Sequence, residues 1–232
     1  MTNSLNQRTY ELFKKDIMTF SLKPGESVSA AKIADRYNVS RTPAREALVK
    51  LETEGLVDIY PQSRSLISKI DIDRANQEWF IRKTLELGVV DGLFAHVTDK
   101  DIEKMYELCR KMAKISETAR THETAYEYLR LDDMFHAMTF HIAGEKLAAE
   151  MLAHTMVHYN RIRLLTDLED SYTHRTGTTH EQMVKSLEKR DKEGYRELLK
   201  QHLSYIAQDT EELKQIYPGI FTEEEFNERI HE

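Results

Sequence analysis

One segment, residues 38–48 with the sequence NVSRTPAREAL, constrains the fold of this chain more than any other. Ser40 is placed to cap a helix, because its hydroxyl can accept a hydrogen bond from a free backbone N–H. Pro43 then falls in the first turn, where a missing N–H costs little. The apolar positions share one face of this helix: Ala44, Ala47, Leu48 and Leu51. We therefore predict a helix from about Ser40 to Glu54 that packs on a small core and ends before Gly55.

The other face of this helix carries two arginines. Arg41 and Arg45 are four residues apart, so both guanidinium groups leave the helix on one side, near its N-terminus. Arg45 suits bidentate contact with guanine, and Arg41 suits a base or a phosphate. The hydroxyls of Ser40 and Thr42 suit phosphate oxygens. The pattern is typical of a helix that reads DNA in the major groove, although spacing alone also allows a solvated face with two surface arginines.

The residues around this helix complete a small domain at positions 1–70. Helical spacing of apolar residues predicts a first helix within residues 5–20. Serines stand where they can cap the first and second helices: Ser4 and Ser29. Asn38 suits the left-handed backbone of the turn before the third helix. Residues 56–60 and 66–70 are predicted to be two short strands, and three helices followed by a hairpin form a winged helix-turn-helix.

After residue 70 the pattern is helical almost to the end of the chain. We expect helices at about 72–96, 99–119, 122–142, 146–170, 180–190 and 192–216. The expected caps and breakers between them are Thr98, Thr179 and Asp191, and Gly144 and Gly177. A capping-box pattern at residues 222–225 predicts a further short helix. The fold class is therefore mainly α, with a winged helix-turn-helix at 1–70 and an all-helical bundle of six or seven helices at 71–232.

Charge and composition limit the classes of protein that the chain can be. The net charge is −7, yet residues 1–70 carry 11 basic and 8 acidic side chains. A mildly basic head on an acidic body allows phosphate contact in the head only. The single cysteine, Cys109, rules out an intrachain disulfide and fits a reducing compartment. We expect no membrane span, because the most apolar stretch, residues 85–97, is too short, and with no secretory leader visible we expect a cytoplasmic location.

Four possible metal ligands lie in the helical part of the chain. Asp132 and His136 are four residues apart on an expected helix, so both can ligate one ion. His180 and His202 are single histidines on later helices. On spacing alone, ordinary surface or core histidines explain this set better than a metal site does.

The residues around the two arginines match a longer pattern. It comprises Pro24-Gly25, residues 34–48 (ADRYNVSRTPAREAL) and residues 51–57 (LETEGLV), and it resembles the GntR superfamily of bacterial transcription regulators. The resemblance implies DNA contact by Arg41 and Arg45, with Thr42 beside them.

Two positions of the head depart from the family pattern. Some relatives have an arginine near the start of the second helix, where this chain has Lys32, which we expect to contact a phosphate. The family's wing often reads Pro-x-Arg-Gly, whereas Ser63 and Arg64 fill the last two places here. Losing the glycine changes the backbone of the wing tip. We still expect Arg64 to reach the minor groove or a phosphate.

The helical part resembles the FCD ligand-binding domain of the same superfamily. The resemblance is carried by DxxFH at 132–136, by Ala143-Gly144, by THE at 179–181 and by QHL at 201–203. It implies that one aspartate and three histidines hold a divalent metal: Asp132, His136, His180 and His202. This donor set suits zinc or nickel and leaves coordination positions open for a small carboxylate or water.

An effector site is expected beside the metal. Arg82 falls in a region that resembles an Arg/Glu pattern of FCD domains and can bind a carboxylate bidentately, although a simple pair between Arg82 and Glu86 explains it equally well. Asn160 and Arg161, in a polar cluster that also holds Tyr159 and Arg163, are further effector candidates.

Two classes of function follow from these observations. The leading hypothesis is a transcription regulator, acting as a repressor, that binds a palindromic operator as a homodimer and responds to a small carboxylate bound near the metal. The alternative is a metal-dependent hydrolase or lyase with an appended DNA-binding head, because an aspartate and three histidines can activate water. No further carboxylate or histidine has a clear general-base role, so the first hypothesis is favoured.

Overall fold

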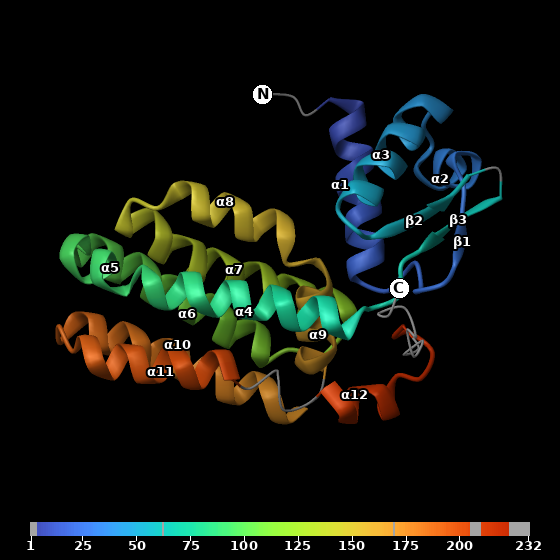
Figure 1. Ribbon diagram of the computed structural model, residues 1–232. Helices are drawn as coiled ribbons and strands as arrows, with labels where there is room; N and C mark the ends of the chain where they lie inside the picture. The colour runs from blue at the N-terminus through green and yellow to red at the C-terminus, as the bar shows by residue number, and fades with distance from the viewer. Residues whose placement is uncertain (1–3, 62, 169, 205–209, 223–232) are drawn as a thin grey trace, which may run out of the picture.

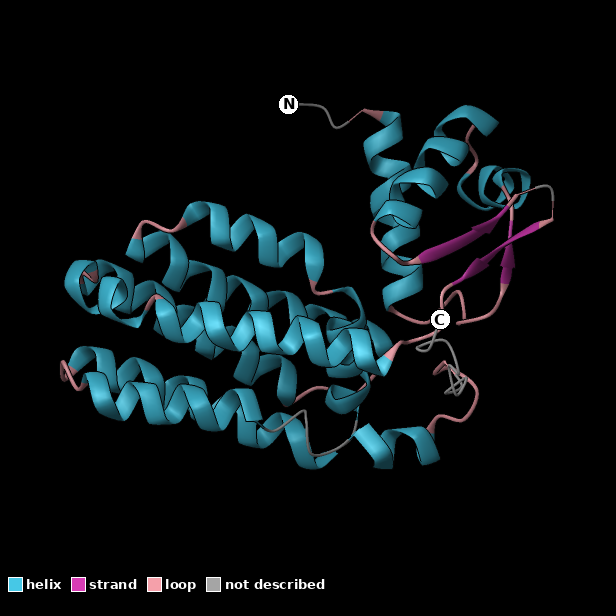
Figure 2. Ribbon diagram, in the orientation of Figure 1, coloured by secondary structure: helices cyan, strands magenta, loops and turns pink. Residues whose placement is uncertain are grey.

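The computed structural model describes residues 4–61, 63–168, 170–204 and 210–222 of the chain. These residues form a small head and a larger helical body, which lie side by side (Figure 1). The strands of the described residues all lie in the head, and the body is helical (Figure 2). The predicted fold class, a winged helix-turn-helix joined to an all-helical bundle, is confirmed.

The head contains the expected helices and one strand more than expected. Its elements are α1 (Leu5–Met18), β1 (Ser27–Val28), α2 (Ala30–Tyr37), α3 (Arg41–Thr53), β2 (Val57–Tyr60) and β3 (Arg64–Ile67). The strands form an antiparallel sheet in the order β1-β3-β2. The expected hairpin is therefore a three-stranded sheet. Because β1 has only two residues, it is too short to give a periodic signal in the sequence.

Three serines stand at the N-caps of the head's helices, and two of them cap as expected. Ser4 accepts a hydrogen bond from the backbone of Gln7, and Ser29 accepts one from Lys32. Ser40 occupies the N-cap of α3 but makes no such bond, so that expectation was wrong. The reason is Pro43, which stands at the third helical position and has no N–H to give.

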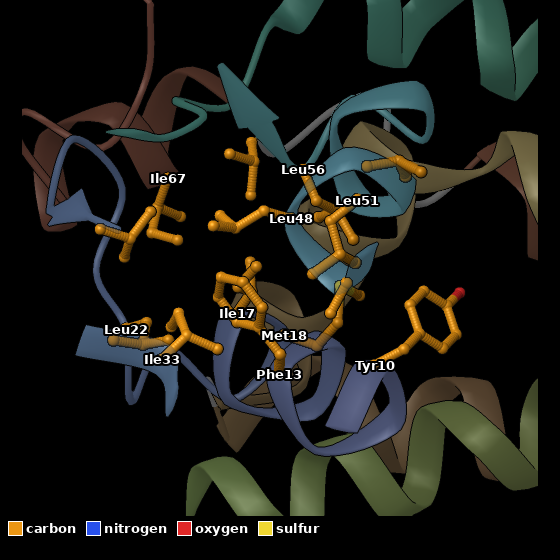
Figure 3. Close-up of a cluster of buried hydrophobic side chains, with 14 of the residues drawn as sticks. Tyr10, Phe13, Ile17, Met18, Leu22, Ile33, Leu48, Leu51, Leu56 and Ile67 are labelled. Carbon is orange, nitrogen blue, oxygen red and sulfur yellow. The ribbon is translucent and has the colours of Figure 1, made fainter. Parts of the chain in front are cut away.

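The core of the head joins all three helices to the sheet. Phe13 and Ile17 of α1 meet Leu51 of α3 and Ile67 of β3, and all four side chains are fully buried (Figure 3). Burying a side chain of this size stabilises the fold by about 1.5–3 kcal/mol. The same cluster continues into the body through Ala125, Leu129, Val157 and Leu164. The head therefore packs on the body through apolar contacts.

The body holds more helices than the six or seven expected. They are α4 (Ile72–Gly88), α5 (Val90–His96), α6 (Asp99–Ser116), α7 (His122–Ala143), α8 (Lys146–Thr155), α9 (Val157–Leu168), α10 (Asp170–Glu188), α11 (Lys192–Ser204) and α12 (Thr210–Ile216). Two expected helices are each divided. The first breaks at Val89, directly after Gly88, and the other breaks at Met156, where ψ is 47°. The second break lets α8 pack on α7 while α9 runs toward the head.

Several expected helix ends are present, and two are not. Thr98 caps α6 with a full capping box, Asp191 accepts a hydrogen bond from the backbone of Gly194, and Gly144 ends α7 in the left-handed conformation. Gly177 and Thr179 were wrong as breaker and cap, because α10 runs through both. A glycine inside a helix costs only about 1 kcal/mol, which packing can offset. The expected helix at 222–225 falls largely outside the described residues.

The junction between head and body is tied in three places. The backbone N–H of Asp71 donates to Nδ1 of His158 on α9 at 3.0 Å. Residues near the C-terminal end of the described chain return to Ile70, whose N–H donates to Ile220 and whose carbonyl accepts from Thr222, both at 2.9 Å. Arg161 of α9 donates to Ser68 at 3.2 Å. Within the described residues, none of the helices has the length and hydropathy needed to cross a membrane.

Candidate DNA-reading helix, metal cluster and cavity

The α3 helix presents the predicted DNA-contacting side chains to solvent. Its apolar face, with Ala44, Ala47, Leu48 and Leu51, packs inside the head. Ser40, Arg41, Thr42 and Arg45 are exposed on its other side. Because Ser40 makes no capping bond, its hydroxyl remains available to a phosphate at the helix N-terminus. The arrangement is the one that major-groove reading requires.

The two other candidates of the head are exposed as well. The ammonium group of Lys32 on α2 donates to the carbonyl of Ser27 at 2.9 Å, so a phosphate contact would add to or replace that bond. Arg64 stands at the start of β3 with its guanidinium 5.9 Å from the ring centre of Tyr60. Both cations lie on the surface of the head and can contribute to attraction for DNA.

The four predicted metal ligands come together inside the body. Asp132 and His136 lie on α7, His180 on α10 and His202 on α11. All four are buried, and one ligand atom of each lies within 4.8 Å of the others. Nε2 of His136 is 3.2 Å from Nε2 of His180 and 3.1 Å from Nε2 of His202, while His180 Nε2 is 3.0 Å from an Asp132 oxygen. A carboxylate and three imidazoles are the donors that zinc and similar ions take.

The protonation of the cluster also fits a cation. His136 Nδ1 lies 2.6 Å from Glu86 Oε2, so Nδ1 carries the proton and Nε2 offers its lone pair to the centre of the cluster. Burial lowers the pKa of His180 and holds the pKa of His202 well below its usual range, which keeps both rings neutral. The Nδ1 atoms of both rings are buried without a hydrogen-bond partner among the described residues. The ring nitrogens that face one another here have few protons to share, whereas a cation between them can accept their lone pairs.

Two arginines and two further carboxylates surround the cluster. Arg82 donates to Glu86 at 2.5 Å and to Asp132 at 3.4 Å. Arg163 forms a very short contact with Asp132 and donates to Asp133 at 2.6 Å. Although burial raises the pKa of Asp132, the charge of Arg163 and the contacts with His136 and His180 together outweigh it and hold that pKa well below its usual range. The attraction of His136 and Arg82 likewise overcomes burial and lowers the pKa of Glu86 to about 2.

A cavity of about 130 Å³ lies directly beside the cluster. His136, Arg82 and Glu86 form part of its polar wall, together with Asn160 and Arg163 of α9. The remaining wall is apolar apart from Asp133 and consists of Ala137, Phe140, Ala149, Leu152, Ala153 and Met156. The cavity can take a small ligand with one polar end and one apolar end.

The structure places two of the three effector candidates in this cavity. Arg82 and Asn160 line it, and the expected alternative for Arg82, a pair with Glu86, is also present. Arg161, the third candidate, does not line this cavity: it is fully buried against the head, where its guanidinium lies 5.9 Å from the ring of Phe20. Successive helical residues point about 100° apart, so Arg161 faces away from the cavity while Arg163, three positions after Asn160, shares its face.

Two residues of this site were not expected in these roles: Glu86 as the partner of His136, and Asp133 on the cavity wall. Arg163 belonged to the expected polar cluster, but Arg161 was preferred to it. Glu86 was considered only as a partner for Arg82, because residues 50 positions apart give no joint signal in one sequence. A local signal was available for Arg163: it follows Asn160 by three residues and so shares its helix face, whereas Arg161 does not.

Comparison with known proteins places both parts of the chain. The model of the bacterial regulatory proteins of the gntR family matches residues 5–67, and the FCD domain model matches residues 79–205. The transcriptional repressor RspR of Escherichia coli K12 is 28% identical over 223 residues, which cover 96% of both chains. The solved structure of E. coli McbR/YncC has a TM-score of 0.74 at 22% identity and covers 92% of this chain and 99% of its own.

A second solved structure shows the same fold. It is a GntR transcriptional regulator from Rhodococcus sp. RHA1, with a TM-score of 0.68 at 18% identity, covering 93% of this chain and all of its own. The matched domains and relatives are transcriptional regulators and not enzymes, which counts against the hydrolase or lyase alternative. The chain belongs to the GntR family of bacterial transcriptional regulators and carries an FCD domain after its DNA-binding head.

Proposed function

We propose that this regulator is a repressor that binds a palindromic operator as a homodimer and is controlled by a small carboxylate bound beside a divalent metal. The observation that carries the proposal is the cluster of Asp132, His136, His180 and His202 beside a cavity that is lined by α9, the helix that also contacts the head. The relative RspR is named a repressor, which supports the same sign of regulation here. The boundary between the two functions falls near residue 70.

DNA reading is assigned to the exposed side of α3. Arg45 takes a guanine, Arg41 a base or a phosphate, and Ser40 and Thr42 take phosphates. Lys32 and Arg64 add sequence-independent attraction. A dimer places one α3 in each half-site, so the operator should repeat with the two-fold symmetry of the protein.

The metal would be held by Asp132, His136, His180 and His202, with zinc or nickel as the best candidates for this donor set. When bound, such an ion supplies positive charge and open coordination positions beside the cavity. Glu86 holds the ring of His136 in orientation through its Nδ1 proton. Arg163 and Asn160 of α9 supply the hydrogen-bond donors for an effector carboxylate.

The effector signal would reach the head through α9. Asn160 and Arg163 face the cavity, while His158 and Arg161, on the same helix, hold residues 71 and 68 at the junction. A ligand that favours one position of α9 then also favours one position of the head. The first turn of α4, which begins directly after Asp71, moves with this junction.

The DNA assignment is tested with an operator selected from random sequence by the purified protein. Arg45→Ala should lower the affinity for that operator by about 10-fold or more, because a bidentate arginine–guanine contact discriminates by about 1–3 kcal/mol. Arg110→Ala, which removes an exposed arginine of α6, is the matched control and should bind as the wild type does. Unchanged affinity of Arg45→Ala, measured by fluorescence anisotropy, would remove Arg45 from the interface.

The metal assignment is tested by elemental analysis of the purified protein. We expect about one divalent ion per chain, and its loss in Asp132→Ala and His202→Ala. His141→Ala, an exposed histidine on the same helix as His136, should keep the ion. A folded wild-type protein that carries no ion after purification and binds none when zinc or nickel is added would refute the site.

A further inference from the structure

Arg163 divides its hydrogen bonds between two aspartates of very different exposure. Its Nη2 contacts Asp132, which is buried within the metal cluster. Its Nη1 donates to Asp133 at 2.6 Å and to the side-chain oxygen of Asn160 at 2.7 Å. The side chain of Asp133 is 46% exposed, whereas that of Asp132 is 5% exposed. Both Asp133 and Arg163 line the cavity.

Both arginines that line the cavity, Arg82 and Arg163, are paired with carboxylates. Arg82 is held by Glu86 and Asp132, both of which are buried, so it cannot turn to a ligand without leaving two buried charges uncompensated. The contact between Arg163 and Asp133 is different, because Asp133 can move into water. An entering carboxylate can take its place on the buried guanidinium, so the exchange leaves Arg163 paired. Among the described carboxylates that pair with these two arginines, Asp133 is therefore the one that a ligand can displace at low cost.

The charges around the cavity also favour displacement of Asp133. Arg82 and Arg163 face three carboxylates, those of Glu86, Asp132 and Asp133. Asp133 is the exposed member of the three, and moving it outward makes the wall less negative and exposes Nη1 of Arg163 at the same moment.

We propose that Asp133 is a built-in competitor for the effector: its carboxylate occupies the place on Arg163 that the effector's carboxylate takes. This inference rests on the proposed effector site and adds to it the group that sets its affinity. The ligand exchanges one carboxylate for another on Nη1 of Arg163, and Asp133 turns to solvent. The protein thereby binds its effector more weakly than the cavity allows, which keeps the regulator unresponsive at low effector concentration.

The cavity also limits the size of the ligand. Its volume is about 130 Å³, somewhat below the roughly 150 Å³ of an apolar cavity that holds benzene in another protein. Since its wall away from the arginines is apolar, we expect a short monocarboxylate with a hydrocarbon end.

The test compares carboxylate binding by the wild type, Asp133→Asn and Asp133→Ala. The probes are straight-chain monocarboxylates from acetate to hexanoate and benzoate, each titrated calorimetrically into full-length protein supplied with Zn²⁺. For the probe that binds tightest, Asp133→Asn should lower the Kd about tenfold, and Asp133→Ala should lower it at least as much, because a charged competitor for Arg163 is removed. The corresponding carboxamide should bind equally to all three proteins, whereas a change in cavity shape would alter both probes.

Glu127→Gln is the matched control, because it removes an exposed carboxylate of the same helix outside the cavity. It should leave the Kd unchanged. If the wild type binds and both Asp133 variants bind no tighter, the competitor role is refuted while the effector site stands. If none of the proteins binds any of the carboxylates, the competitor role and the proposed effector site both fail, and the DNA assignment through Arg45 is unaffected.

Discussion

Replacing Glu86 by glutamine tests how the metal ligands are held in place. Glu86 is 2% exposed and accepts two hydrogen bonds: one from Nδ1 of His136 at 2.6 Å, the other from Nε of Arg82 at 2.5 Å. Glutamine keeps the size of the side chain but offers one oxygen and one NH₂ group. One of the two donors must then face an NH₂ group, which cannot accept a hydrogen bond.

The expected loss is worked from these two contacts. If His136 loses its acceptor, the ring is free to turn or to move its proton to Nε2, which removes the lone pair that faces the cluster. Loss of such a partner lowers metal affinity by about 10- to 100-fold, which corresponds to about 1.4–2.8 kcal/mol. If Arg82 loses its acceptor instead, the metal affinity changes little, but the fold is destabilised by about 1–3 kcal/mol. Because the contact with His136 is short and Arg82 is charged, neither donor keeps the remaining oxygen entirely, and we expect both the zinc affinity and the stability to fall.

The assay is competition between the protein and a chromophoric zinc chelator. Glu78→Gln is the matched control, because Glu78 lies on the same helix, is equally buried at 2% and accepts from the backbone of Tyr159 instead of a metal ligand. Glu78→Gln should lower the melting temperature and keep wild-type zinc affinity. The reasoning would be refuted if Glu86→Gln kept both full zinc affinity and wild-type stability, or if both variants lost zinc affinity to the same extent.

Two further perturbations test the junction between head and body. Ser68→Ala removes the one hydrogen-bond partner that the fully buried Arg161 has among the described residues, so urea unfolding should show a loss of about 1–3 kcal/mol. Ser65→Ala on the preceding strand β3 should cost much less. His158 should make stability depend on pH, since burial lowers its pKa to about 4. Between about pH 6.5 and pH 4 the unfolded chain binds a proton there that the folded chain does not. With the metal removed by a chelator, the free energy of unfolding should therefore fall as the pH is lowered through this window, by at most about 3 kcal/mol. His158→Asn should show a shallower fall in the same urea titrations, and a slope equal to that of the wild type would rule this origin out.

The head could be predicted well because its signals are local. Ser4 and Ser29 stand three residues before an available N–H, and the left-handed φ of Asn38 is a property of that one residue and its turn. Ser40 shows the limit of such reasoning: it stands at the N-cap position as expected, but Pro43 removes a donor that its hydroxyl would need, so the capping bond is absent. No glycine or proline marks the break at Met156, so no local signal predicted it; beyond the break α9 packs on α10 and α12 as well as on α4 and α7.

The metal ligands could be predicted from the sequence, whereas the residues that surround them could not. The family pattern predicted four metal ligands, Asp132, His136, His180 and His202, whereas spacing alone favoured ordinary histidines. Glu86 and Asp133 gain their roles only from contacts made across the bundle, with His136 in one case and Arg163 in the other. Residues that support a site through tertiary contacts leave no periodic trace in a single sequence, and a structure is needed to find them.

The central claim is that occupancy of the cavity beside the metal cluster controls DNA binding by α3. The most direct test is the affinity of the zinc-loaded wild type for its selected operator, measured by fluorescence anisotropy with and without a saturating amount of the carboxylate that binds tightest. Coupling between two sites in one protein usually amounts to about 1–3 kcal/mol, or about 5- to 150-fold. We predict operator binding at least about fivefold weaker with the carboxylate present, and an operator affinity that stays the same at saturation would contradict the account.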